Sequence, residues 1–136
     1  MPQEPARPPL ILVVEDEAIV RMFGADLLEA AGFAVIEAAD ADEALTVLRR
    51  RDDVSAVFSD VDMPGRLDGA ELAGLIREKW PEIAVVLTSG RGGGGLRGAG
   101  AAFVPKPYEA DTLLREIRNA VRRSAGGDAA RRPSKR

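Results

Sequence analysis

Residues 56–65 read AVFSDVDMPG, an apolar run that ends on Asp60 and leads into a proline and a glycine. A short apolar run bounded by turn residues is typical of a strand buried on both faces, as in a parallel sheet covered by helices. Asp60 would then lie at the carboxyl end of its strand. In open α/β sheets that edge forms the crevice in which ligands bind. The stretch therefore predicts a parallel sheet with a carboxylate at its ligand-binding edge.

The composition limits the chemistry that the chain can perform. Its 136 residues form one domain with room for a substantial core, and no apolar run approaches the roughly 18 residues of a membrane span. The proline-rich start has no signal-peptide core, and the chain has no cysteine, so we expect a cytoplasmic protein without a membrane partner. Histidine is also absent, which removes the commonest metal ligand and general base. Carboxylates, hydroxyls and lysine must carry the chemistry.

Charge is distributed unevenly along the chain. The overall net charge is −3, but residues 122–136 carry about +5 and the remainder about −8. We expect residues 124–136 to be a basic disordered tail, since they begin with the linker-like sequence SAGG. A basic tail could also contact nucleic acid, but we consider a nucleic-acid partner the weaker interpretation.

Strand and helix signals alternate between residues 10 and 123, which we expect to form the domain after a disordered segment at residues 1–9. Apolar runs predict strands at 10–14, 34–38, the run ending at Asp60, 83–89 and 101–104. Helical spacing predicts helices over 18–31 and about 109–122, and Asp40 and Asp68 cap two further helices, each with a glutamate three residues later. Parallel neighbours require crossovers, so this order predicts an α/β fold with a doubly wound, five-stranded parallel sheet.

Residues 89–100 depart from the alternation. Seven of the twelve are glycine, and each glycine costs a helix about 1 kcal/mol relative to alanine. We therefore expect the fourth crossover helix to be short or absent and the segment to be a flexible loop. A glycine-rich phosphate cradle is the alternative, although the spacing matches neither common phosphate-binding motif.

Polar side chains end or directly follow four of the five predicted strands. Glu15 and Asp16 follow the first strand, Asp60 ends the third, Thr88 and Ser89 end the fourth, and Lys106 follows the fifth. Carboxylates crowded into one crevice repel each other unless a cation lies among them, and oxygen ligands suit Mg²⁺. A metal ion, an ammonium and a hydroxyl together match the charge on a transferring phosphoryl group, which leaves Asp60 as the nucleophile.

Each of these residues also has an ordinary structural explanation. Glu15 and Asp16 could cap the first helix, Thr88 could be a strand residue, and Lys106 could be a solvated turn lysine. Their occurrence together at one sheet edge is the argument for a functional site.

The chain resembles the receiver domain of bacterial two-component response regulators over about residues 10–123. The matching motifs are the acidic pair Glu15-Asp16, the run from Asp60 to Pro64, Asp68-Gly69, Thr88 and Lys106-Pro107. The resemblance implies the flavodoxin-like strand order 2-1-3-4-5. It also implies a signalling phosphoprotein rather than an enzyme.

The resemblance assigns a role to each site residue. It implies that Asp60 accepts a phosphoryl group from a phosphohistidine on a sensor histidine kinase or a histidine phosphotransfer protein. Glu15, Asp16, Asp60 and the main-chain carbonyl of Asp62 would hold Mg²⁺. Thr88 and Lys106 would contact the phosphoryl oxygens, and Thr88 and Phe103 would form the conformational switch. The Lys106–Pro107 bond would be cis.

The sequence departs from the family pattern mainly in features that affect how a receiver signals to its downstream partner. Glu15 replaces the more frequent aspartate, and the turn after Pro64 is extended. A missing fourth helix would alter the surface through which receivers commonly signal. With no effector domain after Arg123, we expect a stand-alone receiver that acts on a downstream protein partner or passes phosphate onward, and a homodimer stays open.

Asp60-Val61-Asp62 also resembles the nucleophile and acid pair of haloacid-dehalogenase-type phosphohydrolases. That motif belongs on the first strand of its fold and is followed by a cap insertion, and neither condition is met here. This phosphohydrolase is the alternative function.

Overall fold

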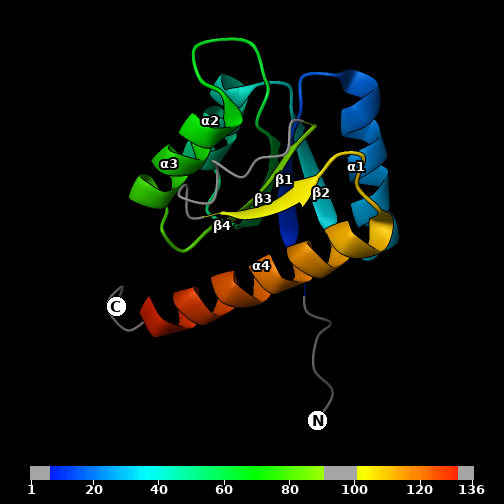
Figure 1. The fold of residues 1–136 in the computed structure, drawn as a ribbon. Helices are drawn as coiled ribbons and strands as arrows, with labels where there is room; N and C mark the ends of the chain where they lie inside the picture. The colour runs from blue at the N-terminus through cyan, green and yellow to red at the C-terminus, as the bar shows by residue number, and fades with distance from the viewer. Residues whose placement is uncertain (1–6, 91–100, 132–136) are drawn as a thin grey trace.

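The structure is a computed structural model that describes residues 7–90 and 101–131, with side chains described as far as Ser124. Figure 1 shows the order of its elements. They are β1 (Leu10–Val14), α1 (Ala18–Ala30), β2 (Ala34–Ala38), α2 (Ala41–Arg50), β3 (Val54–Asp60), α3 (Gly69–Lys79), β4 (Ala84–Ser89), β5 (Ala102–Pro105) and α4 (Ala110–Arg131). All five strands are parallel in one sheet of order β2-β1-β3-β4-β5, as predicted.

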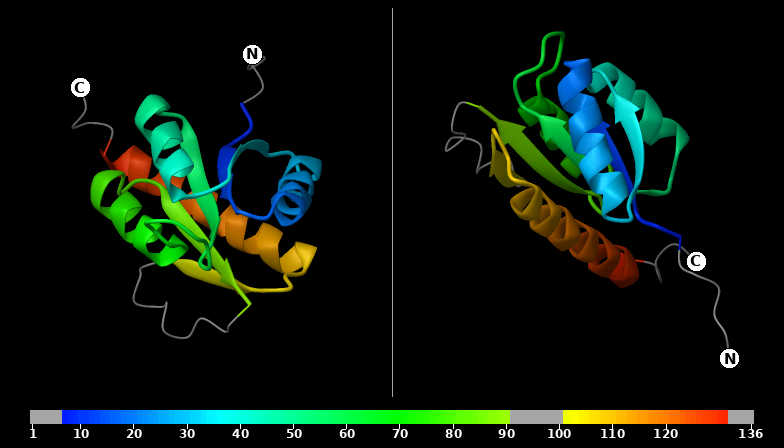
Figure 2. Two further views of the ribbon diagram at one scale, coloured as in Figure 1. Left: turned by 90° about the horizontal axis from the view of Figure 1, so that it is seen from above. Right: turned by 90° about the vertical axis from the view of Figure 1, so that its right-hand side faces the viewer.

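Two hydrophobic clusters cover the two faces of the sheet, because alternate residues of a strand point to opposite faces. Leu12, Val57 and Leu87 pack with α2 and α3 on one face. Ile11, Phe58 and Val86 pack with α1 and α4 on the other. Figure 2 shows the helices lying on both sides of the sheet. The doubly wound α/β architecture is therefore confirmed.

Side-chain caps fix where α2 and α3 begin. Asp40 accepts a hydrogen bond from the Glu43 backbone N–H at 2.8 Å. Asp68 and Glu71 form the complete capping box, in which each side chain accepts from the other residue's N–H. Each cap satisfies donors that a helix start would otherwise leave unpaired. Both predicted helix starts are confirmed.

The last helix ends later than predicted. We expected it to stop at about Arg122, but α4 continues to Arg131. Extending an existing helix adds a hydrogen bond for each residue fixed, which opposes the cost of the two glycines at 126 and 127. Residues 132–136 lie outside the described part of the chain.

The predicted glycine-rich loop also lies largely outside the described residues. Ser89 ends β4 and Gly90 follows it, and the description resumes at Ala101, immediately before β5. The expected short or absent fourth crossover helix and the alternative phosphate cradle both concern residues 91–100, so both stay predictions. Within the described helices, none is long and apolar enough to cross a membrane.

The register of the sheet places the site residues at one edge. Asp60 lies opposite Thr88 in the β3–β4 pair, and Ser89 lies opposite Pro105 in the β4–β5 pair. Glu15 follows the last residue of β1 directly. Because all strands are parallel, these residues meet at the carboxyl edge of the sheet.

Candidate functional site

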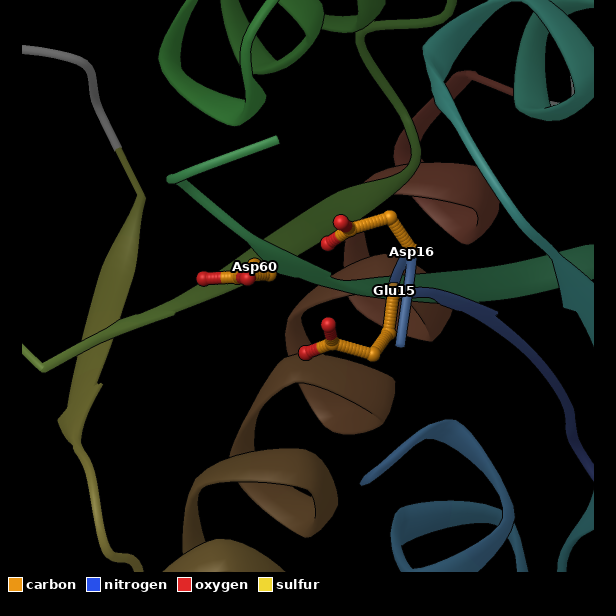
Figure 3. Close-up of side chains that lie close together, drawn as sticks. All are labelled: Glu15, Asp16 and Asp60. Atoms are coloured by element: carbon orange, nitrogen blue, oxygen red, sulfur yellow. The ribbon is translucent and has the colours of Figure 1, made fainter. Parts of the chain in front are cut away.

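Three carboxylates form the centre of the site. Oxygen atoms of Glu15, Asp16 and Asp60 all lie within 4.8 Å of one another. Glu15 and Asp60 are each 4% exposed, whereas Asp16 is exposed to solvent. Figure 3 shows Glu15 and Asp16 extending from the end of β1 toward the side on which Asp60 lies. The predicted acidic cluster is therefore present.

Lys106 brings a positive charge to two of these carboxylates. Its Nζ lies 3.1 Å from Glu15 Oε1 and 3.3 Å from Asp60 Oδ2. Burial alone would lower the pKa of Lys106, but the hydrogen bond to Glu15 and the charges of Asp60 and Glu15 raise it above its ordinary value. The ammonium stays protonated and bridges the ends of β1 and β3.

Glu15 is the most constrained of the three carboxylates. Its Oε2 accepts a hydrogen bond from the Glu17 N–H at 3.0 Å, while its Oε1 accepts from Lys106. Burial and the charge of Asp60 raise the pKa of Glu15, although these two hydrogen bonds and the charge of Lys106 oppose the rise. The folded protein therefore resists a full set of negative charges here, as expected of a site built around a cation.

Thr88 contributes a hydroxyl that has no partner among the described residues. The residue is 2% exposed, and its Oγ1 is buried without a hydrogen bond. The Thr88 carbonyl accepts from the Val61 N–H at 2.9 Å, which ties the end of β4 to the residue after Asp60. A buried hydroxyl left unpaired costs free energy, so an unsatisfied donor on the strand position opposite Asp60 points to a ligand oxygen as its partner.

The side chain of Asp62 bonds to Ser89 and does not join the acidic cluster. Its Oδ2 accepts a hydrogen bond from Ser89 Oγ at 2.8 Å, and its N–H donates to Asp60 Oδ1 at 3.2 Å. Its carboxylate is not part of the metal-type grouping found among the described residues. This arrangement is compatible with the predicted use of the Asp62 carbonyl, which stays a prediction.

A close contact between backbones holds α3 against the end of β3. A Cβ built on Gly69 would lie 2.1 Å from the Asp60 carbonyl oxygen, so only glycine fits at this position. The Gly69 N–H donates to the Val61 carbonyl at 2.9 Å. The first residue of α3 therefore packs directly against the backbone of Asp60 and Val61.

Aromatic contacts anchor the segment that carries Lys106. Tyr108 makes an edge contact with Phe58 of β3 at a centroid distance of 5.5 Å and stacks on Phe23 of α1 at 6.1 Å. Burial raises the pKa of Tyr108. The Lys106–Pro107 bond is cis, as predicted. Phe103, the predicted switch residue, is partly buried against the α2–α3 side of the core.

Sequence reasoning missed two contributors, Arg21 and Tyr108. Arg21 reaches the main chain at Glu15 from the first turns of α1. A cation near the start of a helix opposes the helix dipole, and this misfit was the available signal. For Tyr108 only its position two residues after Lys106 was suggestive.

The side chains present fit a Mg²⁺ ion. Mg²⁺ binds oxygen ligands and usually takes one or two carboxylates while keeping several waters. The cluster offers three carboxylates and no nitrogen or sulfur ligand, and one of the three, Asp16, is open to solvent. Glu15, Asp16 and Asp60 are therefore the residues that would hold the ion.

Comparison with known proteins identifies the family. The family model for the response regulator receiver domain matches residues 11–118. The chain belongs to the receiver domain family of response regulators. The receiver-domain resemblance noted in the sequence is thus confirmed, and phosphoryl acceptance in two-component signalling is the activity that this family membership supports.

Sequence relatives carry the receiver as part of longer proteins. The chain is 38% identical over 109 residues to the response regulator protein FleR of Pseudomonas aeruginosa, covering 76% of this chain and 23% of FleR. It is 36% identical over 110 residues to the nitrogen assimilation regulatory protein NtrX of Azorhizobium caulinodans, covering 76% of this chain and 24% of NtrX. The chain spans about a quarter of the length of these relatives.

Solved structures show the same fold. The receiver domain of NtrX from Brucella abortus superposes with a TM-score of 0.77 at 36% identity, covering 82% of this chain and 98% of that domain. The response regulator TrrA from Thermotoga maritima, solved in complex with Mg²⁺ and BeF, gives 0.75 at 27% identity over 82% of this chain and 98% of TrrA. These matches do not favour the phosphohydrolase alternative, and Asp60 ends β3 rather than the first strand of the fold.

Proposed function

We propose that this receiver accepts a phosphoryl group on Asp60 from a phosphohistidine donor in a Mg²⁺-dependent reaction, and that Thr88 and Phe103 then switch conformation. The observation that carries this proposal is the convergence on Asp60 of a buried unpaired hydroxyl, a lysine ammonium and two further carboxylates. The first two match a phosphoryl group, and the carboxylates match its counter-ion.

The transfer step exchanges one bond for another. A carboxylate oxygen of Asp60 forms the new bond to phosphorus as the bond from phosphorus to the donor imidazole nitrogen breaks, and the donor ring, protonated on its other nitrogen, leaves as neutral imidazole. Lys106 would follow the charge from the carboxylate to the phosphoryl oxygens, and Thr88 Oγ1 would donate its hydrogen bond to one of them. Bound Mg²⁺ would neutralise phosphoryl charge as transfer proceeds. The product is a phosphoprotein, so we propose a signalling protein rather than an enzyme.

An exposed apolar surface beside the site suits a protein donor. Ile19 is 80% exposed, and Met22 and Phe23 are each 54% exposed on α1, which begins at the crevice. Phe23 stacks on Tyr108, two residues beyond Lys106, so this apolar surface continues onto the segment beside the acidic cluster. Exposed apolar patches commonly mark protein interaction sites. A sensor histidine kinase or a histidine phosphotransfer protein is the class of partner proposed to dock here.

The downstream target of the receiver stays a prediction. We propose that it acts in the cytoplasm on a downstream protein partner or passes the phosphoryl group onward, as a stand-alone receiver. Neither a homodimer nor a particular pathway is favoured by the contacts of the described residues.

Phosphoryl uptake with and without metal tests this proposal. The protein is incubated with a small acyl phosphate in Mg²⁺ or in EDTA, and its intact mass is measured. We expect one added phosphoryl group in Mg²⁺ and almost none in EDTA. Uptake that is equal in EDTA would refute the metal dependence. Steady hydrolysis of a phosphomonoester would instead favour the phosphohydrolase alternative.

A further inference from the structure

Arg21 joins the ends of two strands beside the acidic cluster. Its Nη1 donates to the main-chain carbonyl of Glu15 at 2.8 Å, and its Nε donates to Glu37 Oε1 of β2 at 2.9 Å. The Arg21 side chain is 19% exposed. Since the guanidinium donors are fixed in one plane, the bond to Glu37 holds the guanidinium in place, and the other bond then restrains the Glu15 carbonyl.

The Glu15 carbonyl shares a rigid peptide plane with the nitrogen of Asp16. A hydrogen bond to that carbonyl therefore limits rotation of the plane and the direction in which the Asp16 side chain leaves the backbone. The Glu15 N–H is held as well, by donation to the Ala38 carbonyl at 3.1 Å. The junction between β1 and the acidic pair is fixed on both sides.

Asp16 depends on this junction more than the other two carboxylates do. Glu15 is bonded to Glu17 and Lys106, and Asp60 is bonded to Lys106 and the Asp62 N–H. Across residues 7–90 and 101–124, no side-chain hydrogen bond or ion pair holds the Asp16 carboxylate, which is exposed. Its position is therefore set mainly by its backbone.

We propose that Arg21 is a positioning residue for the metal site, because it fixes the Glu15–Asp16 peptide plane and so holds Asp16 in place to bind Mg²⁺. This inference rests on the proposed function. Groups that orient metal ligands are commonly worth about 10- to 100-fold in metal affinity. Charge alone argues the opposite, since a cation beside the site repels Mg²⁺.

These opposed directions make the test decisive. Mg²⁺ affinity is measured by calorimetry on the full chain for Arg21→Gln, Arg21→Lys and the control Arg51→Gln. Arg51 pairs with Asp53 just before β3, at the opposite end of the sheet. We expect Arg21→Gln to weaken Mg²⁺ binding about tenfold. Arg21→Lys should also weaken it, because lysine keeps the charge but loses the planar fork. Arg51→Gln should leave the affinity within twofold of wild type.

Melting in EDTA, followed for each variant, separates positioning from general stability. Unchanged or tighter Mg²⁺ binding in both Arg21 variants, with or without a lower Tm, would overturn the inference. If Arg21→Gln does not fold, Arg21→Lys decides alone. A wild-type protein that binds no Mg²⁺ would refute the proposed function itself, whereas wild-type binding with unaffected Arg21 variants refutes only the positioning role.

Discussion

Among the described residues, Thr88 is the one whose buried side-chain polar atom, Oγ1, lacks a hydrogen bond. Thr88→Val should raise the free energy of unfolding of the unphosphorylated protein by about 1 kcal/mol, because it replaces an unpaired hydroxyl with a methyl group. The same change should weaken binding of beryllofluoride, a phosphoryl mimic, about tenfold by removing a donor to a charged group.

Urea denaturation and beryllofluoride titration measure these two effects. Thr88→Ser is the matched control, since it keeps the hydroxyl and should keep most of the binding. Tight beryllofluoride binding by the valine variant would show that Thr88 does not contact the phosphoryl group.

The three carboxylates should contribute unequally to Mg²⁺ binding. Both oxygens of Glu15 already accept hydrogen bonds, from Glu17 and from Lys106, whereas Asp16 is exposed. We therefore expect Asp16→Asn and Asp60→Asn to reduce Mg²⁺ affinity more than Glu15→Gln does. Calorimetric titration of the three variants checks the order, and equal losses would contradict it.

Glu15→Gln should in addition stabilise the metal-free protein. Because the pKa of Glu15 is raised on folding, its charged form is disfavoured in the folded state, and the destabilisation grows as the pH rises past the ordinary glutamate pKa. At neutral pH in EDTA the uncharged variant should therefore melt at a higher temperature than wild type. Equal or lower melting temperatures for the variant would contradict this prediction.

At the scale of elements, the contact between α3 and β3 is the most demanding one at the site. A Cβ on Gly69 would collide with the backbone of Asp60 and Val61, so Gly69→Ala should displace the start of α3. We expect a loss of about 2 kcal/mol in the free energy of unfolding, typical of forced overpacking. Phosphoryl uptake should fall as well, because the Asp60 backbone must move.

Gly74 supplies the control within the same helix. Nothing lies within 4 Å of a Cβ built there, so Gly74→Ala should stabilise the protein by about 0.5–1 kcal/mol. Urea denaturation of both variants measures the contrast. A Gly69→Ala protein as stable as wild type would mean that α3 can shift freely from the end of β3.

Elements were predictable where the signal is local. The strands are apolar runs that end at polar residues, and the capping residues Asp40 and Asp68 mark where α2 and α3 begin. The site followed because the ends of parallel strands share one edge. Contacts between distant residues were beyond local patterns, such as the hydrogen bond from Arg21 to the Glu15 carbonyl and the packing of Gly69 on Asp60. The end of α4 was predicted too early, because the linker-like composition after Arg123 was taken to end the helix.

At the scale of the whole molecule, the packed core supports one edge of the sheet that carries several charged side chains. The two core clusters bury both faces of the sheet, while a single edge gathers the carboxylates, Thr88 and Lys106. Like charges at that edge reduce stability, and the packed faces tolerate the cost. A bound cation would offset this charge repulsion, so binding at the site should raise the free energy of unfolding of the whole domain.

Locating the phosphoryl group tests this account most directly. After reaction with a small acyl phosphate in Mg²⁺, borohydride reduces a phosphorylated aspartate to homoserine, which peptide mass spectrometry then locates. We predict homoserine at position 60 in wild type and at no position in Asp60→Asn. Homoserine at Asp16 or Asp62, or labelling of the Asp60→Asn variant equal to that of wild type, would contradict the assignment of Asp60 as the acceptor.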